Sequence, residues 1–143
     1  ALDVLFRPPF VRSRRERDIE ERAHRALALA GIDAVADRWA ADLVWTERQL
    51  VQIARTLVCD PKILLLDEPA SGMGLKEIEG VEEIIRKVRE GGVTVVVVSH
   101  DVKMLMNLSD TVTVLNFGQK IAEGAPEAIQ KDPRVLEAYL GAE

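Results

Sequence analysis

Two acidic residues stand side by side at the end of an apolar run, and they are the residues of this chain best suited to chemistry. Asp67 and Glu68 follow the segment ILLL at 63–66 and precede Pro69. A carboxylate at a strand end can hold Mg²⁺ through its water shell, and a second one can orient or deprotonate an attacking water. The pair favours phosphoryl transfer, although an Asp-Glu pair can also do no more than cap the next helix.

A histidine occupies the equivalent position in a second apolar run. The segment VVVVSHD at 95–101 ends in Ser99, His100 and Asp101. In parallel α/β sheets, ligands bind beyond the carboxyl ends of the strands. His100 is therefore expected near the Asp67–Glu68 pair, whereas His24, which lies among arginines in a helical segment, is expected at the surface.

The elements that position these residues can be predicted from apolar periodicity and from glycine and proline stops. The predicted helices cover 13–30, 46–58, 76–92, 102–108 and 133–140, and the predicted strands cover 62–67, 93–98, 111–116 and 120–124. Alternation of strand and helix predicts an α/β fold with a parallel sheet and right-handed crossovers. The first two strands are apolar on both faces, which predicts that both faces are buried.

The composition is that of an ordinary globular protein. The chain has 143 residues, of which 48% are hydrophobic and 30% charged, and this length suits one domain. Its apolar runs are too short to cross a bilayer. The net charge of −5 argues against a general nucleic-acid binder, and a single cysteine excludes an internal disulfide framework.

Taken together, these segments resemble the ATP-binding subunits of ABC transporters, and the resemblance covers nearly the whole chain. ILLLDEP is similar to the Walker B segment, SGMG to the D-loop, and VVVVSHD to the segment that carries the switch histidine. The tail NFGQKIAEGAPEAIQKDPRVLEAYLG resembles subunits of the branched-chain amino-acid uptake class.

The resemblance implies a partial P-loop NTPase fold that works with ATP and Mg²⁺. It gives Asp67 the Mg²⁺ role, Glu68 the role of catalytic base, and His100 a contact with the γ-phosphate. Residues 1–57 would belong to the helical signature subdomain and 58–143 to the C-terminal half of the ATPase core. The D-loop would comprise Ser71, Gly72, Met73 and Gly74.

Two segments depart from the family pattern. The signature Leu-Ser-Gly-Gly-Gln, which grips the γ-phosphate of ATP held by the partner subunit, aligns with Leu43, Val44, Trp45, Thr46 and Glu47. Val44 has no hydroxyl group, and Trp45 prevents the close backbone approach that glycine permits. The Thr46 hydroxyl and helix N-terminal amides can replace part of that contact. Gly74 stands where the D-loop usually has an aspartate.

The phosphate-binding loop itself is missing from the sequence. The pattern G-x-x-x-x-G-K-[ST] does not occur, because none of the nine glycines is followed by lysine. We therefore expect this chain to be the C-terminal part of a longer domain, with the loop upstream of Ala1, and to be inactive by itself. The expected partners are a second ATP-binding subunit and a membrane permease at the inner face of the membrane, with no nucleic acid.

Two other functions remain open at this point. The altered signature and D-loop are compatible with a degenerate, non-catalytic subunit that binds and regulates a partner. The same fold also occurs in ABC ATPases of DNA repair and translation. Those relatives usually carry long insertions or nucleic-acid surfaces, which this acidic, compact sequence lacks.

Overall fold

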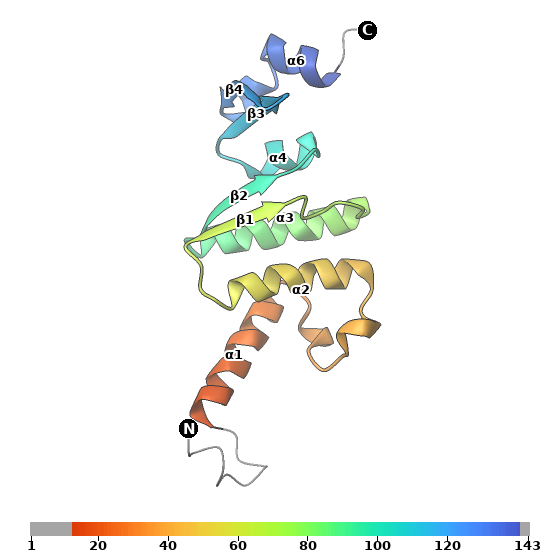
Figure 1. Cartoon of the computed structure of the whole chain (residues 1–143), viewed down its shortest axis with the longest axis vertical. Helices are drawn as coiled ribbons and strands as arrows, with labels where there is room; N and C mark the ends of the chain where they lie inside the picture. Colours follow the sequence, from red (N-terminus) through yellow and green to blue (C-terminus); the bar gives the residue numbers. More distant parts are fainter. Residues whose placement is uncertain (1–12, 141–143) are drawn as a thin grey trace. The chain divides into compact units, whose positions relative to one another are not determined.

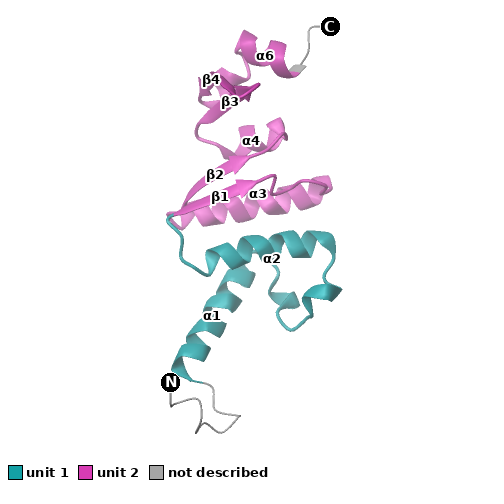
Figure 2. Cartoon of the chain, in the orientation of Figure 1, with its two compact units in different colours: residues 1–62 teal, residues 63–143 magenta. Residues whose placement is uncertain are grey.

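The structure is a computed structural model that describes residues 13–140. The chain separates into two compact units, Ala1–Lys62 and Ile63–Glu143 (Figure 2). The described part of the first unit is helical, and the second unit contains all the described strands.

The helices and strands follow the order in which they were predicted (Figure 1). In chain order they are α1 (Arg14–Leu29), η1 (Asp33–Val35), η2 (Ala40–Asp42), α2 (Trp45–Leu57), β1 (Ile63–Asp67), α3 (Leu75–Glu90), β2 (Thr94–Val98), α4 (Val102–Leu108), β3 (Val112–Asn116), β4 (Gln119–Gly124), α5 (Pro126–Ile129) and α6 (Pro133–Leu140). The sequence prediction did not include the short 3₁₀ helices η1 and η2 or the single turn α5.

The first unit is built on the packing of α1 against α2. Helix α1 begins in a capping box, in which the Ser13 hydroxyl accepts a hydrogen bond from the Glu16 amide at 3.0 Å and the Glu16 carboxylate accepts one from the Ser13 amide. The chain turns after α1 at Gly31, whose φ of +68° favours glycine. Ala26 on α1 and Ile53 on α2 are buried, as the apolar periodicity predicted.

The second unit contains the parallel strand pair that carries the acidic residues. Strands β1 and β2 pair in register from Ile63 opposite Thr94 to Asp67 opposite Val98. Helix α3 connects them, and its residues Val81, Ile84, Ile85 and Val88 are buried. This β-α-β unit confirms the predicted α/β class with a parallel sheet.

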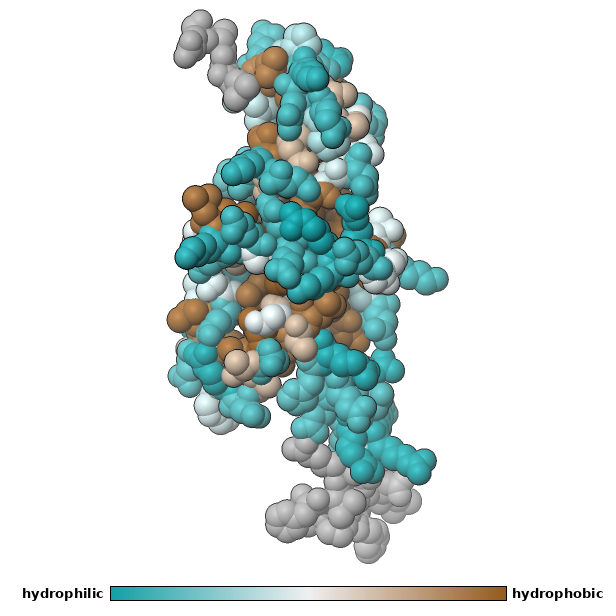
Figure 3. Space-filling model, turned by 180° about the vertical axis from the view of Figure 1, so that it is seen from behind, coloured by the Kyte–Doolittle hydropathy of each residue, from teal (hydrophilic) through white to brown (hydrophobic). Residues whose placement is uncertain are grey.

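One face of the β1–β2 pair is open, which corrects the prediction that both faces are buried. Leu65 is 72% exposed and Val98 is 59% exposed, whereas Leu64, on the opposite face of β1, is only 3% exposed. Alternate residues of a strand point to opposite faces, so α3 covers only one set of side chains. Apolar residues are visible on the side of the chain that Figure 3 shows.

The third predicted strand forms the hairpin that the turn segment NFGQ at 116–119 predicts, and it is not hydrogen-bonded to the parallel pair. Strand β3 pairs with β4 in an antiparallel hairpin, and the described strands form two separate two-stranded sheets. The hairpin turns at Phe117 and Gly118, which have φ values of +46° and +76°. Two consecutive residues with positive φ suit a tight hairpin turn, so the local pairing of β3 with β4 is strongly specified.

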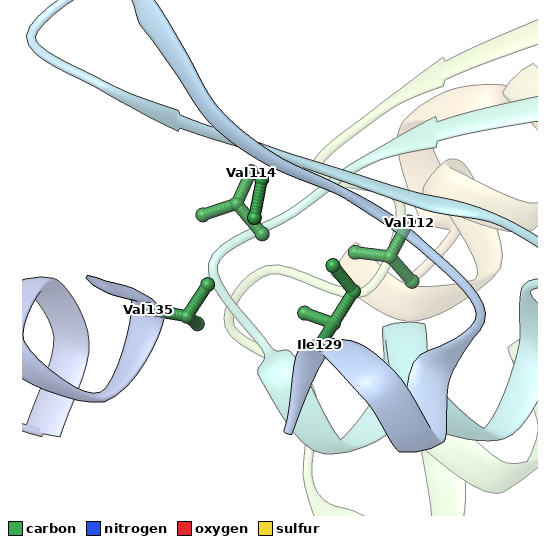
Figure 4. Close-up of a cluster of buried hydrophobic side chains, with 5 residues drawn as sticks. Val112, Val114, Ile129 and Val135 are labelled. Carbon is green, nitrogen blue, oxygen red and sulfur yellow. The ribbon is translucent and has the colours of Figure 1, made fainter. Parts of the chain in front are cut away.

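The hairpin has its own small core (Figure 4). Val112 and Val114 of β3 face Ile129 of α5 and Val135 of α6, and Ala122 of β4 completes the cluster. Burial of these side chains fixes the face that β3 turns toward the C-terminal helices. Among residues 13–140, no helix is both long enough and apolar enough to cross a membrane.

Candidate functional site

Glu68 lies one residue beyond β1 in an unusual backbone conformation. Its amide donates to the Val98 carbonyl at 2.8 Å, so it extends the hydrogen bonding between β1 and β2. Its φ is +48°, a left-handed value that is uncommon for residues other than glycine. A non-glycine residue is held in this region only when its surroundings fix it, and such residues cluster at functional sites.

The surroundings that fix Glu68 come from the end of β2. Its Oε1 accepts two hydrogen bonds from His100, one from the backbone amide at 2.9 Å and one at Nδ1 at 2.8 Å. Its Oε2 accepts from the Ser99 hydroxyl at 3.2 Å. The two predicted catalytic residues are thus in direct contact, and we call Glu68 and His100 the strand-end pair.

Each member of the strand-end pair stabilises the charged form of the other. The hydrogen bond from the His100 side chain is the main cause that lowers the pKa of Glu68 below its ordinary value of 4.5. The same bond, followed by the charge of Glu68, raises the pKa of His100 above 6.5. Glu68 is therefore ionised at neutral pH, and His100 is protonated more often than an isolated histidine.

The strand-end pair faces solvent. The His100 side chain is 79% exposed and that of Glu68 is 35% exposed, while Asp67, at the last position of β1, is also exposed. No group of three or more potential metal ligands occurs among residues 13–140. Mg²⁺ does not require such a cage, because it commonly uses one or two carboxylates together with waters and substrate phosphates. The exposed Asp67 carboxylate fits that need.

Helix α4 begins two residues after His100. The Asp101 carboxylate caps α4 by accepting from the Met104 amide at 2.9 Å, and Met104 is only 1% exposed. The Asp101 amide in turn donates to the Ser99 hydroxyl at 3.1 Å. Ser99 thus links the carboxylate of Glu68 to the helix cap. The sequence analysis gave Ser99 no role, although its place between the strand and His100 was the available signal.

The segment predicted as the D-loop begins three residues after Glu68. Two turns form it, with the Ser71 amide donating to the Glu68 carbonyl and the Met73 amide donating to the Ala70 carbonyl, both at 3.1 Å. Gly72 has a φ of +76°. Gly74 is the N-cap of α3, and its amide donates to the Glu77 carboxylate at 2.7 Å. The backbone of Gly74 is therefore engaged in starting α3.

The segment predicted as the signature lies at the start of α2, in the first unit, and we call residues 43–47 the α2 entry. Leu43 is buried and its carbonyl accepts from Arg48 Nε at 2.8 Å. Val44, the N-cap, is 59% exposed, and Trp45, the first helical residue, is 51% exposed. Neither side chain can accept a hydrogen bond from the amides at the start of the helix, and another group accepts from one of these amides.

That group is the carboxylate of Glu47. Its Oε2 accepts from the Val44 amide at 3.0 Å, and its Oε1 accepts from Arg38 at 2.7 Å. The amide of Val44, and then the Arg38 side chain, lower the pKa of Glu47. Arg38 also donates to the Asp42 carbonyl at 2.6 Å. The α2 entry therefore carries its own bound anion, a role for Arg38 that the sequence analysis did not foresee.

Two family descriptions match the sequence. Residues 4–71 match the family described as "ABC transporter". Residues 119–143 match the family described as "Branched-chain amino acid ATP-binding cassette transporter". The first match ends just beyond Glu68, and the second covers β4 and the helices after it.

Curated relatives extend these matches over most of the chain. "High-affinity branched-chain amino acid transport ATP-binding protein BraF" of Pseudomonas aeruginosa is 40% identical over 138 residues, which are 96% of this chain and 54% of the relative. The protein of the same description called LivG, from Escherichia coli strain K12, is 37% identical over 139 residues, with the same shares of 96% and 54%. The chain spans about half the length of the curated relatives it matches.

Solved structures of ATP-binding cassettes also superpose on this chain. The crystal structure of the ADP conformation of MJ1267, described as an ATP-binding cassette of an ABC transporter, superposes with a TM-score of 0.80 at 28% identity. This likeness covers 99% of the present chain and 56% of that chain. A nucleotide-free ATP-binding cassette from an ABC transporter superposes with a TM-score of 0.74.

Proposed function

Because the chain belongs to the family of ABC transporter ATP-binding proteins, we propose that it supplies one half of the hydrolytic centre of an ATPase that drives amino-acid import. The observation that supports this proposal most is the strand-end pair, in which Glu68 and His100 are in contact at the carboxyl ends of two paired parallel strands. Branched-chain amino acids are the proposed cargo, since the relatives named above transport them and residues 119–143 match that class.

The proposed roles follow from the chemistry of each side chain. Glu68 is ionised at neutral pH and can accept a hydrogen bond from a water aligned with the γ-phosphate of ATP. Protonated His100 can donate to a phosphate oxygen and stabilise negative charge there. Asp67 would hold Mg²⁺, which would neutralise phosphate charge when bound.

The contact within the strand-end pair also regulates how basic Glu68 is. A carboxylate with a lowered pKa is a weak proton acceptor, and general bases work best when their pKa is near the working pH. If His100 turns toward a phosphate, Glu68 loses the hydrogen bond that lowers its pKa most. We therefore propose that phosphate binding draws His100 away and makes Glu68 a stronger base.

The proposed setting is a larger assembly. A phosphate-binding loop is absent from this sequence, so the nucleotide would be held jointly with a segment that carries such a loop. We propose that the complete subunit pairs with a second ATP-binding subunit, homologous or identical, and docks on a membrane permease at the inner face of the cell membrane.

The test is ATP-dependent uptake of leucine, isoleucine and valine by vesicles that contain a complete subunit carrying this chain together with its permease. Uptake that requires ATP and disappears in Glu68→Gln supports the proposal. Uptake of another solute would overturn the cargo alone, and hydrolysis that is unaffected by Glu68→Gln would overturn the catalytic role.

A second candidate function rests on the α2 entry. There the Glu47 carboxylate already occupies the Val44 amide and carries negative charge where the family pattern has a neutral glutamine. A phosphate that approached these amides would meet this charge. This observation favours a subunit that pairs with a homologue and contributes its strand-end pair to hydrolysis, but leaves its α2 entry inactive.

A further inference from the structure

Side-chain hydrogen bonds are made at both ends of the short helix α4. At its start, the Asp101 carboxylate accepts from the Met104 amide at 2.9 Å. At its end, the Leu108 carbonyl accepts from Nη1 of Arg89 at 2.9 Å. Arg89 lies in the last turn of α3, 19 residues earlier in the chain. The last carbonyls of a helix have no partner within the helix, so α3 supplies a donor that α4 lacks.

Arg89 also brings a positive charge to the end of α4. The last turn of α4 contains no basic residue, and a cation near a helix C-terminus stabilises the helix. Nη2 of Arg89 lies 3.3 Å from Oδ1 of Asp110, but the Asp110 side chain is 78% exposed, so this ion pair contributes little. The bond to the Leu108 carbonyl is partly buried and is the stronger contact. Asp110 therefore serves mainly to orient the guanidinium of Arg89.

The position of α4 bears directly on the strand-end pair. With seven residues, α4 is too short to be stable by itself, so its place depends on contacts with its neighbours. Its N-cap, Asp101, follows His100 in the chain, and the Asp101 amide donates to the Ser99 hydroxyl at 3.1 Å. That hydroxyl donates to the Glu68 carboxylate at 3.2 Å. A shift of α4 would therefore move residues that hold Glu68 and His100 together.

We propose that Arg89 is a positioning residue for the strand-end pair and that it acts through α4. The bonds from its guanidinium end at Leu108 and Asp110, so Arg89 holds α4 at the end opposite to His100. With α4 fixed at both ends, the His100 amide stays directed at Oε1 of Glu68, which lies 2.9 Å away. The expected effect on hydrolysis rests on the proposed function, whereas the effect on the geometry of the strand-end pair does not.

The first test is hydrogen exchange of the full 143-residue chain that carries Arg89→Ala. Three amides report on the bonds between α4 and the strand-end pair, because each donates to a side chain there, and we call the amides of His100, Asp101 and Met104 the reporter amides. We expect each to exchange at least roughly threefold faster in the variant. The amide of Glu68, which joins β1 to β2, should exchange at the parent rate.

The matched control is Lys87→Ala. Lys87 is a basic residue in the same turn of α3, and its substitution breaks an ion pair with Glu83 that has an N–O distance of 2.8 Å. This change removes a charge of the same sign, but the bond that it breaks lies within α3. The reporter amides should therefore exchange as they do in the parent chain.

Two milder variants grade the effect. Arg89→Lys keeps the charge and one donor for the Leu108 carbonyl, so its reporter amides should exchange at rates between those of the parent and Arg89→Ala. Asp110→Ala keeps the bond to Leu108 and should have a smaller effect than Arg89→Ala. If Arg89→Ala does not fold, Arg89→Lys provides the same comparison.

The second test measures ATP hydrolysis by a complete subunit that carries this chain. Arg89→Ala should lower kcat by roughly five- to tenfold and leave KM for ATP within about twofold of the parent value. The reason is that it disturbs the residues expected to act on the attacking water and leaves those expected to hold the nucleotide in place. Arg89→Lys should recover part of the loss, and Lys87→Ala should hydrolyse ATP at the parent rate.

The outcomes are distinct. Faster exchange confined to the reporter amides, together with a lower kcat that Arg89→Lys partly restores, supports the proposal. Unchanged reporter amides, or faster exchange spread evenly over the chain, would overturn it, and so would parent-level hydrolysis by Arg89→Ala when Glu68→Gln is inactive. If Glu68→Gln itself hydrolyses ATP at the parent rate, the proposed function fails, and the exchange comparison alone decides the role of Arg89.

Discussion

The strand-end pair and the α2 entry are both organised around a glutamate carboxylate, and they differ in what holds it. Glu68 receives a backbone amide and a side-chain nitrogen from His100, which lies 32 residues away. Glu47 receives a backbone amide from three residues away and a guanidinium from Arg38, nine residues away. The first arrangement depends on the tertiary fold, and the second is nearly local.

The identity of the cation decides how permanent each arrangement is. Arginine stays charged at every pH at which a protein is folded, so Arg38 holds Glu47 continuously. Histidine changes charge near neutral pH, so the charge that His100 presents to Glu68 depends on pH. The comparison indicates that the strand-end pair is built to change its state and the α2 entry is built to keep it.

The largest expected effect separates the two regions directly. In a complete subunit, Glu68→Gln should lower ATP hydrolysis by roughly 100-fold or more, because it removes a general base, while nucleotide binding persists. Steady-state phosphate release would measure the loss. The control is Glu79→Gln on the exposed surface of α3, which should hydrolyse ATP at the parent rate. Equal activity of the two variants would refute the catalytic role of Glu68.

A smaller effect is expected at the α2 entry. Glu47→Gln removes the negative charge that is bound to the Val44 amide at the start of α2, and Val44→Ser restores a hydroxyl at the N-cap. Together they should raise ATP hydrolysis by the paired subunits roughly three- to tenfold. Arg38→Ala, which breaks the ion pair but leaves the carboxylate charged, serves as control and should give no rise. If the double variant is no faster than the parent, the self-capped α2 entry does not limit hydrolysis.

A third prediction concerns the support of His100. Asp101→Ala removes the cap of α4, which should lower the free energy of unfolding by about 1 kcal/mol. Urea denaturation of the chain would measure it. Lys103→Ala, on the exposed side of the same helix, should change stability much less. An unchanged midpoint for Asp101→Ala would show that α4 does not need this cap.

The smallest effect is a dependence on pH. Because the pKa of Glu68 is lowered in the folded state, its ionised form adds stability that is fully present above pH 4.5. This stability is lost as the pH falls through the folded-state pKa of Glu68. Because the pKa of His100 is raised in the folded state, its protonated form adds stability that is fully present below pH 6.5. This stability is lost as the pH rises through the folded-state pKa of His100. The contact between Glu68 and His100 should therefore stabilise the fold most between about pH 4.5 and about pH 6.5. Nuclear magnetic resonance titration should show that the raised pKa of His100 is lost in Glu68→Gln and that the pKa of Glu68 moves back toward 4.5 in His100→Ala. Unchanged Glu68 titration in that variant would contradict this account.

Local sequence predicted most of the elements because their signals are local. Gly31 and Ser13 bound α1, and Asp101 caps α4, at the positions that their residue types indicated. The meeting of Glu68 and His100 was also predictable, because both follow apolar strands whose carboxyl ends share one sheet edge. These inferences need only periodicity, capping and the geometry of parallel strands.

Pairing partners and long-range cover could not be predicted in the same way. The turn segment NFGQ predicts the pairing of β3 with β4, which the structure confirms. The apolar sequence TVTVLN does not show that β3 makes no hydrogen bonds with the parallel pair. Apolar residues on both faces of β1 indicate that other elements must pack on both faces. They do not indicate whether those elements belong to this chain. The bond between Arg38 and Glu47 depends on how the two 3₁₀ turns fold back, which periodicity does not report.

The bond between Glu68 and His100 also fixes the tautomer of the imidazole. An ionised carboxylate can only accept, so the proton of this bond resides on Nδ1 of His100. The other ring nitrogen, Nε2, is then a lone-pair acceptor when the ring is neutral and a donor when it is protonated. A phosphate oxygen can pair with Nε2 only in the second state. The protonation state of the His100 ring thus determines whether an incoming anion meets a hydrogen-bond donor or an acceptor at Nε2.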